Sequence, residues 1–221
     1  MQTYSASSMR GFLAALALPL LLAACSTTGQ PVAEDTAPKV HPADAARYAA
    51  VEGEKFNVPA VSLKHLKPQY MRQLVDYQTV EAPGTVVIDP QNKYLYLVQE
   101  GGKALRYGVG VGKAGLEFTG NANIAYKREW PSWRPTPDMI RRNPDLYEPL
   151  ANGMEGGEKN PLGARAFYLF KDGKDTLYRI HGTNEPWTIG QAMSSGCIRM
   201  MNQDVIDLYT RIPNGSKVVV L

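Results

Sequence analysis

The sequence predicts a mostly β domain, built from antiparallel sheets or a β-sandwich, with one or two short helices and a long lid-like loop. Short runs of β-branched and aromatic residues recur between turn signals from residue 85 onward, which is typical of strands joined as hairpins. A proline- and glycine-rich stretch over residues 130–163 separates two groups of such runs. Because long loops inside a compact domain usually carry function, we expect a lid or a binding loop there.

The first 24 residues indicate an export signal. A single cation, Arg10, precedes an apolar run over residues 11–24 that is short for a membrane span and ends in small residues. Residues 22–25 resemble the bacterial lipobox, which implies lipidation of Cys25 and cleavage just before it. An ordinary secretory signal with a chance cysteine is the alternative. Ser26 is not the aspartate that favours retention in the inner membrane, so the resemblance implies a periplasmic lipoprotein of the outer membrane.

The rest of the chain divides into three predicted segments. Residues 25–57 are rich in alanine, proline and threonine, a composition that buries too little apolar surface to offset chain entropy, so they are predicted to form a flexible tether. Residues 58–83 carry more large side chains, interrupted by Pro59 and Pro68. We expect them to pack on the domain as a partly helical prelude. Residues 84–221 then form the domain itself.

The predicted strands come in two groups. Residues 85–89, 94–98 and 104–111 form a meander, and the glycines at 108 and 110 suggest a bend or the close approach of another backbone. Residues 166–170 and 176–180 form a hairpin around the turn dipeptide Asp172-Gly173. A last strand covers residues 218–221.

The predicted helical content is small. Asn202 is a suitable N-cap for a helix that stops before Pro213, and one helical face carries Val205, Leu208, Tyr209 and Ile212. In the long loop, residues 139–142 suggest a helical turn. Trp130 and Trp133 either anchor this loop in the core or contact substrate.

Composition excludes some classes of function. The net charge is +3, and no dense basic tract or aromatic-interleaved basic patch occurs, so no nucleic acid partner is expected. The chain has three histidines and two cysteines. His41 falls in the tether and His65 in the prelude, which leaves His181 and Cys197 as two ligands at most. We therefore expect neither a metal site nor another cofactor.

His181 and Cys197 are the candidate base and nucleophile. A thiol attacks a carbonyl as its thiolate, which a neighbouring base or cation favours. Arg199 could supply the cation or hold a substrate carboxylate, unless it merely pairs with Asp204 or Asp207. Gly196 would let backbone amides face the developing oxyanion, and the small Ser195 would keep the approach open. From the residues alone, a structural cysteine and histidine remain the more common case.

The motifs His181-Gly182-Thr183 and Ser194 to Met200 resemble the signature of the YkuD-type L,D-transpeptidases. The likeness extends over residues 84–221, including 87–112 and the segment Asn160 to Gly163. It implies that Cys197 is the nucleophile, that His181 transfers the proton, and that the Gly182 carbonyl orients the imidazole. Relatives often have a second histidine where this chain has Ser195, so the resemblance assigns no second imidazole here.

The resemblance also implies the reaction and its partners. Cys197 would attack a peptidoglycan tetrapeptide stem, release D-alanine and hold the stem as a thioester. An amine acceptor, either another stem or a lysine of an envelope protein, would then resolve it. An L,D-carboxypeptidase or hydrolase of the same fold, and a non-catalytic peptidoglycan-binding lipoprotein, remain alternatives. Papain-like and NlpC/P60-like peptidases place the cysteine before the histidine, which is the reverse of the order here.

Overall fold

One sheet carries the fold of the residues that the structure, a computed structural model, describes: 40–112, 118–193 and 197–221. All of them lie in one compact unit of the chain. Within these ranges the sheet has eleven strands. They are β1 (Gln73–Asp76), β2 (Val86–Asp89), β3 (Tyr94–Gln99), β4 (Lys103–Gly108), β5 (Gly110–Gly112), β6 (Gly120–Glu129), β7 (Arg165–Lys171), β8 (Lys174–His181), β9 (Ala192–Met193), β10 (Ile198–Arg199) and β11 (Lys217–Val220).

The described helices are short. Four are α-helical: α1 (Pro42–Ala46), α2 (Pro137–Arg142), α3 (Pro144–Tyr147) and α4 (Asn202–Arg211). The 3₁₀ turns are η1 (Leu63–His65), η2 (Pro68–Tyr70), η4 (Glu148–Leu150) and η5 (Pro186–Thr188). Among the described residues, none of these helices has the length and apolar character needed to cross a bilayer.

The sheet is mixed, although the sequence predicted antiparallel pairing. Its strand order is β1-β4-β3-β2-β11-β6-β7-β8-β10-β5-β9. The hairpins pair antiparallel as expected, but β11 lies parallel to β2, β10 parallel to β8, and β9 parallel to β5. Parallel partners come from segments far apart in sequence, which local turn signals cannot reveal. The mostly β fold class with few short helices is confirmed.

Val109 connects β4 to β5, which lie in different parts of the sheet. The segment predicted as one strand over 104–111 is two strands, and β4 and β5 lie in separate parts of the strand order. Both flanking glycines are required by close contacts: a Cβ at Gly108 would lie 2.4 Å from the Tyr70 carbonyl oxygen, and one at Gly110 would lie 2.8 Å from that of Thr188. The predicted close backbone approach is therefore confirmed.

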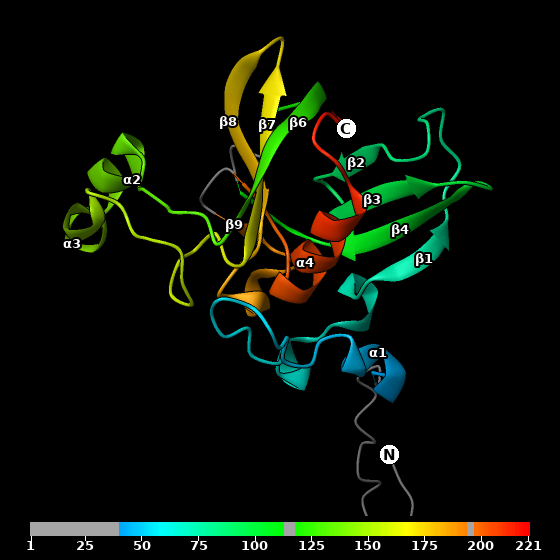
Figure 1. Cartoon of the computed structure of the whole chain (residues 1–221), viewed down its shortest axis with the longest axis horizontal. Helices are drawn as coiled ribbons and strands as arrows, with labels where there is room; N and C mark the ends of the chain where they lie inside the picture. The colour runs from blue at the N-terminus through cyan, green and yellow to red at the C-terminus, as the bar shows by residue number, and fades with distance from the viewer. Residues whose placement is uncertain (1–39, 113–117, 194–196) are drawn as a thin grey trace, which may run out of the picture. The chain divides into compact units, whose positions relative to one another are not determined.

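A single main core joins both halves of the sheet to α4. It combines apolar side chains of β2 and β3 with those of β7, β8 and β10. In Figure 1, α4 lies between the group β1 to β4 and the group β6 to β8. The predicted apolar face of this helix is buried: Val205 and Leu208 are fully covered, and Ile212 nearly so.

The start of α4 differs from the prediction. Met201 is its N-cap and makes no side-chain capping bond, so Asn202 is not the cap. The Asn202 side chain instead accepts a hydrogen bond from the Ala164 amide, at 2.9 Å. The Asn202 side chain, which the sequence predicted to cap the helix, therefore bonds to Ala164, a residue distant in sequence.

Most predicted strands are present, and some strands were missed. The hairpin of β7 and β8 turns at Asp172 and Gly173, both with positive φ (50° and 73°), as an Asp-Gly turn of this type requires. Four strands, β1, β6, β9 and β10, were not predicted from the sequence. Strand β6 is the longest of these, and a bulge between Ile124 and Tyr126 breaks the alternation that would have indicated it.

The packed part of the chain begins earlier than predicted. Residues 40–57 were assigned to the flexible tether, but Tyr48 is only 1% exposed and packs with Leu66 and Met71 of the prelude. Val51 also pairs with Val58. Glu54 forms an ion pair with Arg165 of β7. A few residues hold this segment against the domain, so its average composition did not predict that it is packed.

The long loop is anchored by tryptophan and includes a helical pair. Trp130 is 8% exposed and its indole N–H donates to Glu54, so it is a core anchor. Trp133 is partly buried, pairs with Met154 and contacts the ring of Tyr147. The predicted helical turn is present as part of α2. Figure 1 shows α2 and α3 together, away from α4.

Candidate active site

His181 ends β8 in a buried position with a defined orientation. It is 3% exposed, and its Nδ1 lies 2.5 Å from the Gly182 carbonyl oxygen. Because a carbonyl can only accept, Nδ1 must carry the proton, which leaves Nε2 as the basic nitrogen. The contact with the Gly182 carbonyl thus defines the tautomer of the ring.

Strand β10 brings Cys197 next to this histidine. It runs parallel to β8, with Ile198 in register with Ile180 and Arg199 in register with His181. Cys197 directly precedes β10. With strands about 4.8 Å apart and a rise of about 3.3 Å per residue, the Cα atoms of Cys197 and His181 are roughly 8 Å apart, which the two side chains together can span.

The backbone around Cys197 is held from two sides. Its carbonyl accepts a hydrogen bond from the Gly112 amide at 3.1 Å, and the Met200 amide donates to the His181 carbonyl at 2.8 Å. Cys197 itself is a free, partly exposed cysteine. The backbone that carries the thiol is thus fixed between β5 and β8.

The surroundings of the thiol favour its neutral form at rest. Burial raises the pKa of Cys197, and a hydrogen bond from the Arg179 backbone together with the charges of Arg179 and Arg199 acts in the opposite direction. Burial also lowers the pKa of His181 to about 3, opposed by the Gly182 hydrogen bond, and the two arginines lower it further. The resting pair is therefore a neutral thiol beside a neutral imidazole, whose Nε2 carries no proton.

Arg199 lies on the same face of the sheet as His181, as their parallel register requires. Its guanidinium donates to Glu185 at 2.8 Å, and the arginine side chain is 13% exposed. The alternative that Arg199 pairs with Asp204 or Asp207 is wrong: Tyr48 donates to Asp204, and Arg72 and Arg211 pair with Asp207. The carboxylate beside Arg199 comes from the loop between His181 and η5.

Two glycines and an asparagine shape the turn after His181. A Cβ on Gly182 would lie 2.2 Å from the Asn202 side-chain oxygen, and one on Gly163 would lie 2.3 Å from it. Gly163 also has a positive φ of 61°. The turn before β7, the turn after β8 and the start of α4 therefore meet around one carboxamide.

The contribution of Arg179 and the tertiary contacts of Asn202 were not predicted from the sequence. Arg179 lies two positions before His181 on a strand, so side-chain alternation alone could have placed it on the same face. No sequence signal pointed to the contacts of Asn202 with Gly163 and Gly182. Ser195, Gly196 and Cys25, which the sequence analysis also named, lie outside the described residues.

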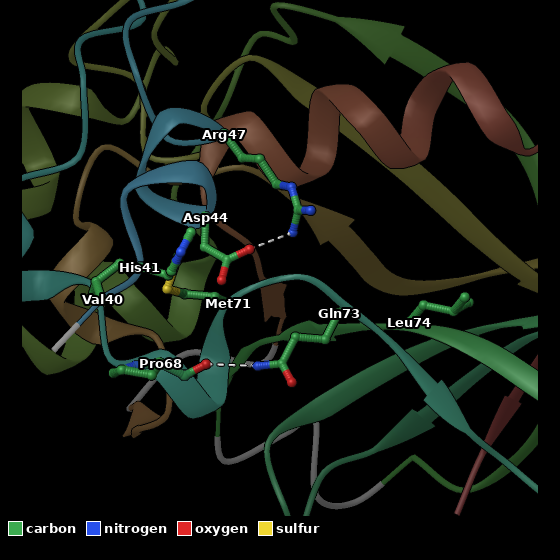
Figure 2. Close-up of a pocket in the computed structure, with 8 residues that line it drawn as sticks. All are labelled: Val40, His41, Asp44, Arg47, Pro68, Met71, Gln73 and Leu74. Carbon is green, nitrogen blue, oxygen red and sulfur yellow. Dashed lines mark hydrogen bonds and ion pairs between the residues drawn. The ribbon is translucent and has the colours of Figure 1, made fainter. Parts of the chain in front are cut away.

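A separate pocket of about 410 Å³ lies at the N-terminal segment. Figure 2 shows its lining, with an ion pair of 3.0 Å between Asp44 and Arg47 and a hydrogen bond from Gln73 to the Pro68 carbonyl. None of the candidate site residues lines it.

In the part of the chain that the structure describes, no group of three or more His, Cys, Asp or Glu residues could hold a metal ion. His41 caps α1, and His65 contacts the ring of Trp187.

The fold and the paired motifs define the class of protein as an L,D-transpeptidase catalytic domain. Residues 83–220 match the model of the YkuD family, described as the L,D-transpeptidase catalytic domain. The chain belongs to this family.

Two curated relatives come from Escherichia coli (strain K12). The probable L,D-transpeptidase ErfK/SrfK is 33% identical over 152 residues, which cover 68% of this chain and 47% of that protein. The probable L,D-transpeptidase YbiS is 30% identical over 149 residues, which cover 66% of this chain and 47% of that protein. The matched region thus spans about half the length of these relatives.

A solved structure from Brucella melitensis is also similar. It is described as a probable carnitine operon oxidoreductase and is 55% identical to this chain. The matched region covers 72% of this chain and 98% of the solved chain, with a TM-score of 0.50.

Proposed function

We propose that this protein is a cysteine-dependent L,D-transpeptidase that acts on peptidoglycan tetrapeptide stems. The parallel pairing of β8 and β10 carries the proposal, because it brings two motifs sixteen positions apart in sequence to one place. The family membership of residues 83–220 supports the reaction class. The neutral thiol and the neutral imidazole, with Nε2 free to accept a proton, support a general-base mechanism.

In the first half-reaction, Cys197 forms a thioester with the stem. Its sulfur attacks the carbonyl of the third stem residue while Nε2 of His181 takes the thiol proton. The C–S bond forms, the amide C–N bond to D-alanine breaks, and His181 returns the proton to the leaving amine. Proton transfer by a positioned side chain typically contributes about 10² to 10⁴ in rate.

In the second half-reaction, an acceptor amine attacks the thioester. The new C–N bond forms as the C–S bond breaks, and the amine proton passes to the sulfur through His181. An amine from another stem would give a 3→3 cross-link, a lysine of an envelope protein would attach that protein, and water would leave a trimmed stem. Ser195 and Gly196 are proposed to face the oxyanion in both steps, and Arg199 to contact substrate.

Intact-protein mass after incubation with a disaccharide tetrapeptide tests the first half-reaction. Acid-quenched wild type is expected to gain the mass of the substrate minus D-alanine, which is the disaccharide tripeptide held as a thioester. The Glu158→Gln variant, in which an exposed loop carboxylate is changed, should gain the same mass. Cys197→Ala should gain nothing while keeping the wild-type melting temperature. A carbapenem serves as an independent probe of the same thiol. Modification that persists in Cys197→Ala, or none in wild type with either probe, overturns the assignment.

Product analysis with three acceptors tests the second half-reaction. A stem peptide, a lysine-terminated peptide and buffer alone would give a dimer, a conjugate and a tripeptide, respectively. Only the tripeptide in all three reactions would identify an L,D-carboxypeptidase.

We also propose that the protein is exported to the periplasm and anchored to the outer membrane by a lipid on Cys25. Labelling with a radioactive fatty acid should mark wild type but not Cys25→Ser, and membrane fractionation should place the label with the outer membrane. Labelling of both forms would exclude Cys25 as the lipidated residue.

A further inference from the structure

Arg179 is fixed beside the candidate nucleophile by contacts on three sides. Its guanidinium donates to both oxygens of Asp175, at 2.7 and 2.8 Å, and to the Tyr178 carbonyl at 2.9 Å. It also lies over the ring of Tyr168, 4.3 Å from the centroid. The arginine side chain is 14% exposed. Two-point pairing and ring stacking are the contacts for which a guanidinium is best suited.

The register of the sheet places the backbone of Arg179 beside that of Cys197. Arg179 is in register with Tyr168 on β7, whose ring stacks on Tyr126 of β6 at 4.2 Å. Extending the parallel ladder of β8 and β10 by one position places Cys197 opposite Arg179. Arg179 also shares the face of His181, because the two residues are separated by two positions on a regular part of β8.

Arg179 affects the pKa of the thiol in two ways. A hydrogen bond from its backbone and its positive charge both lower the pKa of Cys197, and the charge also lowers the pKa of His181. Burial alone would leave the buried thiol inert. Among the groups that oppose burial and lower the pKa of Cys197, those of Arg179 come first, ahead of the charge of Arg199.

We propose that Arg179 is a positioning residue of the site, held by Asp175 and Tyr168 so that its amide orients the Cys197 sulfur and its guanidinium stabilises negative charge there. The inference rests on the proposed function, in which this sulfur is the nucleophile. Arg199 and Glu185 are the other charged pair that faces the site from β10 and the loop after His181. Asp175 faces Arg179 from its own hairpin.

The test is the rate of Cys197 alkylation by iodoacetamide as a function of pH, measured on the full chain. This readout needs no peptidoglycan substrate. Arg179→Gln should move the midpoint of the profile to higher pH and slow alkylation at neutral pH by at least about threefold, since it removes the charge. Arg179→Lys keeps the charge, so the midpoint of its alkylation profile should stay close to that of wild type. Its rate of stem acylation should be lower, because the two-point pairing with Asp175 is lost.

Arg128→Gln is the matched control. Arg128 also stacks on a tyrosine, Tyr126, at 5.3 Å, but it lies on β6, which β7 and β8 separate from β10. Its profile should match that of wild type. Asp175→Asn, which releases the guanidinium without removing it, should fall between wild type and Arg179→Gln.

An unchanged midpoint in folded Arg179→Gln would overturn the inference, as would an equal shift in Arg128→Gln. If Arg179→Gln does not fold, an unchanged profile in Asp175→Asn overturns it instead. Wild type that is alkylated normally but never acylated by a stem would contradict the proposed function and leave the alkylation result on Arg179 intact.

Discussion

The side-chain oxygen of Asn202 occupies the space that a Cβ on Gly182 would need, only 2.2 Å from that position. The glycine after the candidate base is thus required by a residue of α4, twenty positions further along the chain. Since the Gly182 carbonyl also orients the His181 ring, this contact connects helix packing with the geometry of the imidazole.

Gly182→Ala should therefore impair the site more than a surface alanine would. We expect a loss of about 2 kcal/mol in the free energy of unfolding from the overpacked contact, and a fall in stem acylation because the Gly182 carbonyl shifts. Chemical denaturation and acylation rates measure the two effects. Adding Asn202→Ala should restore part of both, because the clashing oxygen is gone. A double variant no better than Gly182→Ala would show that the other neighbours, Ala164 and Val205, dominate.

The low pKa of His181 predicts the pH dependence of acylation. Because its pKa is about 3, the imidazole stays neutral above about pH 4, and no inflection is expected near pH 6.5, where a solvated histidine titrates. Between about pH 5 and pH 7, kcat/KM for thioester formation should be nearly flat. At higher pH it should rise only as the thiol, whose pKa is raised, begins to ionise. A tenfold rise centred near pH 6.5 would contradict a buried, neutral base.

The buried carboxyl of Asp204 should make the free energy of unfolding depend on pH. Its carboxyl is fully buried, and burial raises its pKa to about 7, above the value near 3.9 expected in the unfolded chain. The neutral form is favoured in the folded state, so this stabilising contribution is complete below about pH 4 and is lost as the pH rises through about 7.

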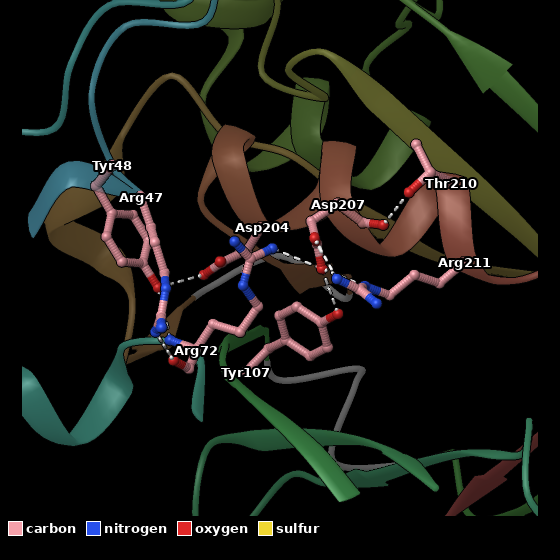
Figure 3. A network of polar contacts seen from close by, with 8 residues as sticks. All are labelled: Arg47, Tyr48, Arg72, Tyr107, Asp204, Asp207, Thr210 and Arg211. Atoms are coloured by element: carbon pink, nitrogen blue, oxygen red, sulfur yellow. Dashed lines mark hydrogen bonds and ion pairs between the residues drawn. The ribbon is translucent and has the colours of Figure 1, made fainter. Parts of the chain in front are cut away.

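Thermal unfolding of wild type and Asp204→Asn across this range measures that loss. The asparagine stays neutral and can still accept the hydrogen bond from Tyr48, so the stability of the variant relative to wild type should increase from pH 4 to pH 7. Figure 3 shows the surrounding network, in which Arg72 pairs with Asp207 at 2.5 Å. Asp145→Asn, an exposed change in α3, is the control. A constant difference between Asp204→Asn and wild type would mean that Asp204 is ionised throughout.

The contacts of Glu54 should hold the N-terminal segment against the domain. Its carboxylate accepts from Arg165 at 2.6 and 2.8 Å and from the Trp130 indole at 2.9 Å, and both charged side chains are mostly buried. Glu54→Gln leaves the arginine charge buried without its counter-ion and should cost about 3 kcal/mol of unfolding free energy. Glu52→Gln, exposed and two positions away, should change little. Equal effects of the two changes in denaturant titrations would contradict a specific anchor.

Local patterns predicted the hairpins because those elements depend on neighbours in sequence. The positive φ at Asp172 and Gly173 comes from a turn dipeptide, and the buried face of α4 comes from the helical spacing of its apolar residues. Strand β10 could not be predicted in this way. It has two residues, and it exists because β8 and β5 pair with it on either side.

The same limit applies to the polar residues. Asn202 carries a side chain that suits a helix cap, and the sequence offers no means of knowing that Ala164 and two glycines would meet it instead. Glu54 and Tyr48 lie in a segment whose composition predicted a flexible tether, yet each has a buried partner more than 100 positions away.

The sequence by itself determined the mostly β class, the identities of His181 and Cys197 as candidates, and the family to which they point. These follow from residue types and short spacings, which are local properties. Only the tertiary structure decided that Arg199 pairs with Glu185, that β10 lies parallel to β8, and that Asn202 contacts the turn after His181. Those relationships depend on the parallel pairing of distant strands and on burial, and both arise only when the whole chain packs.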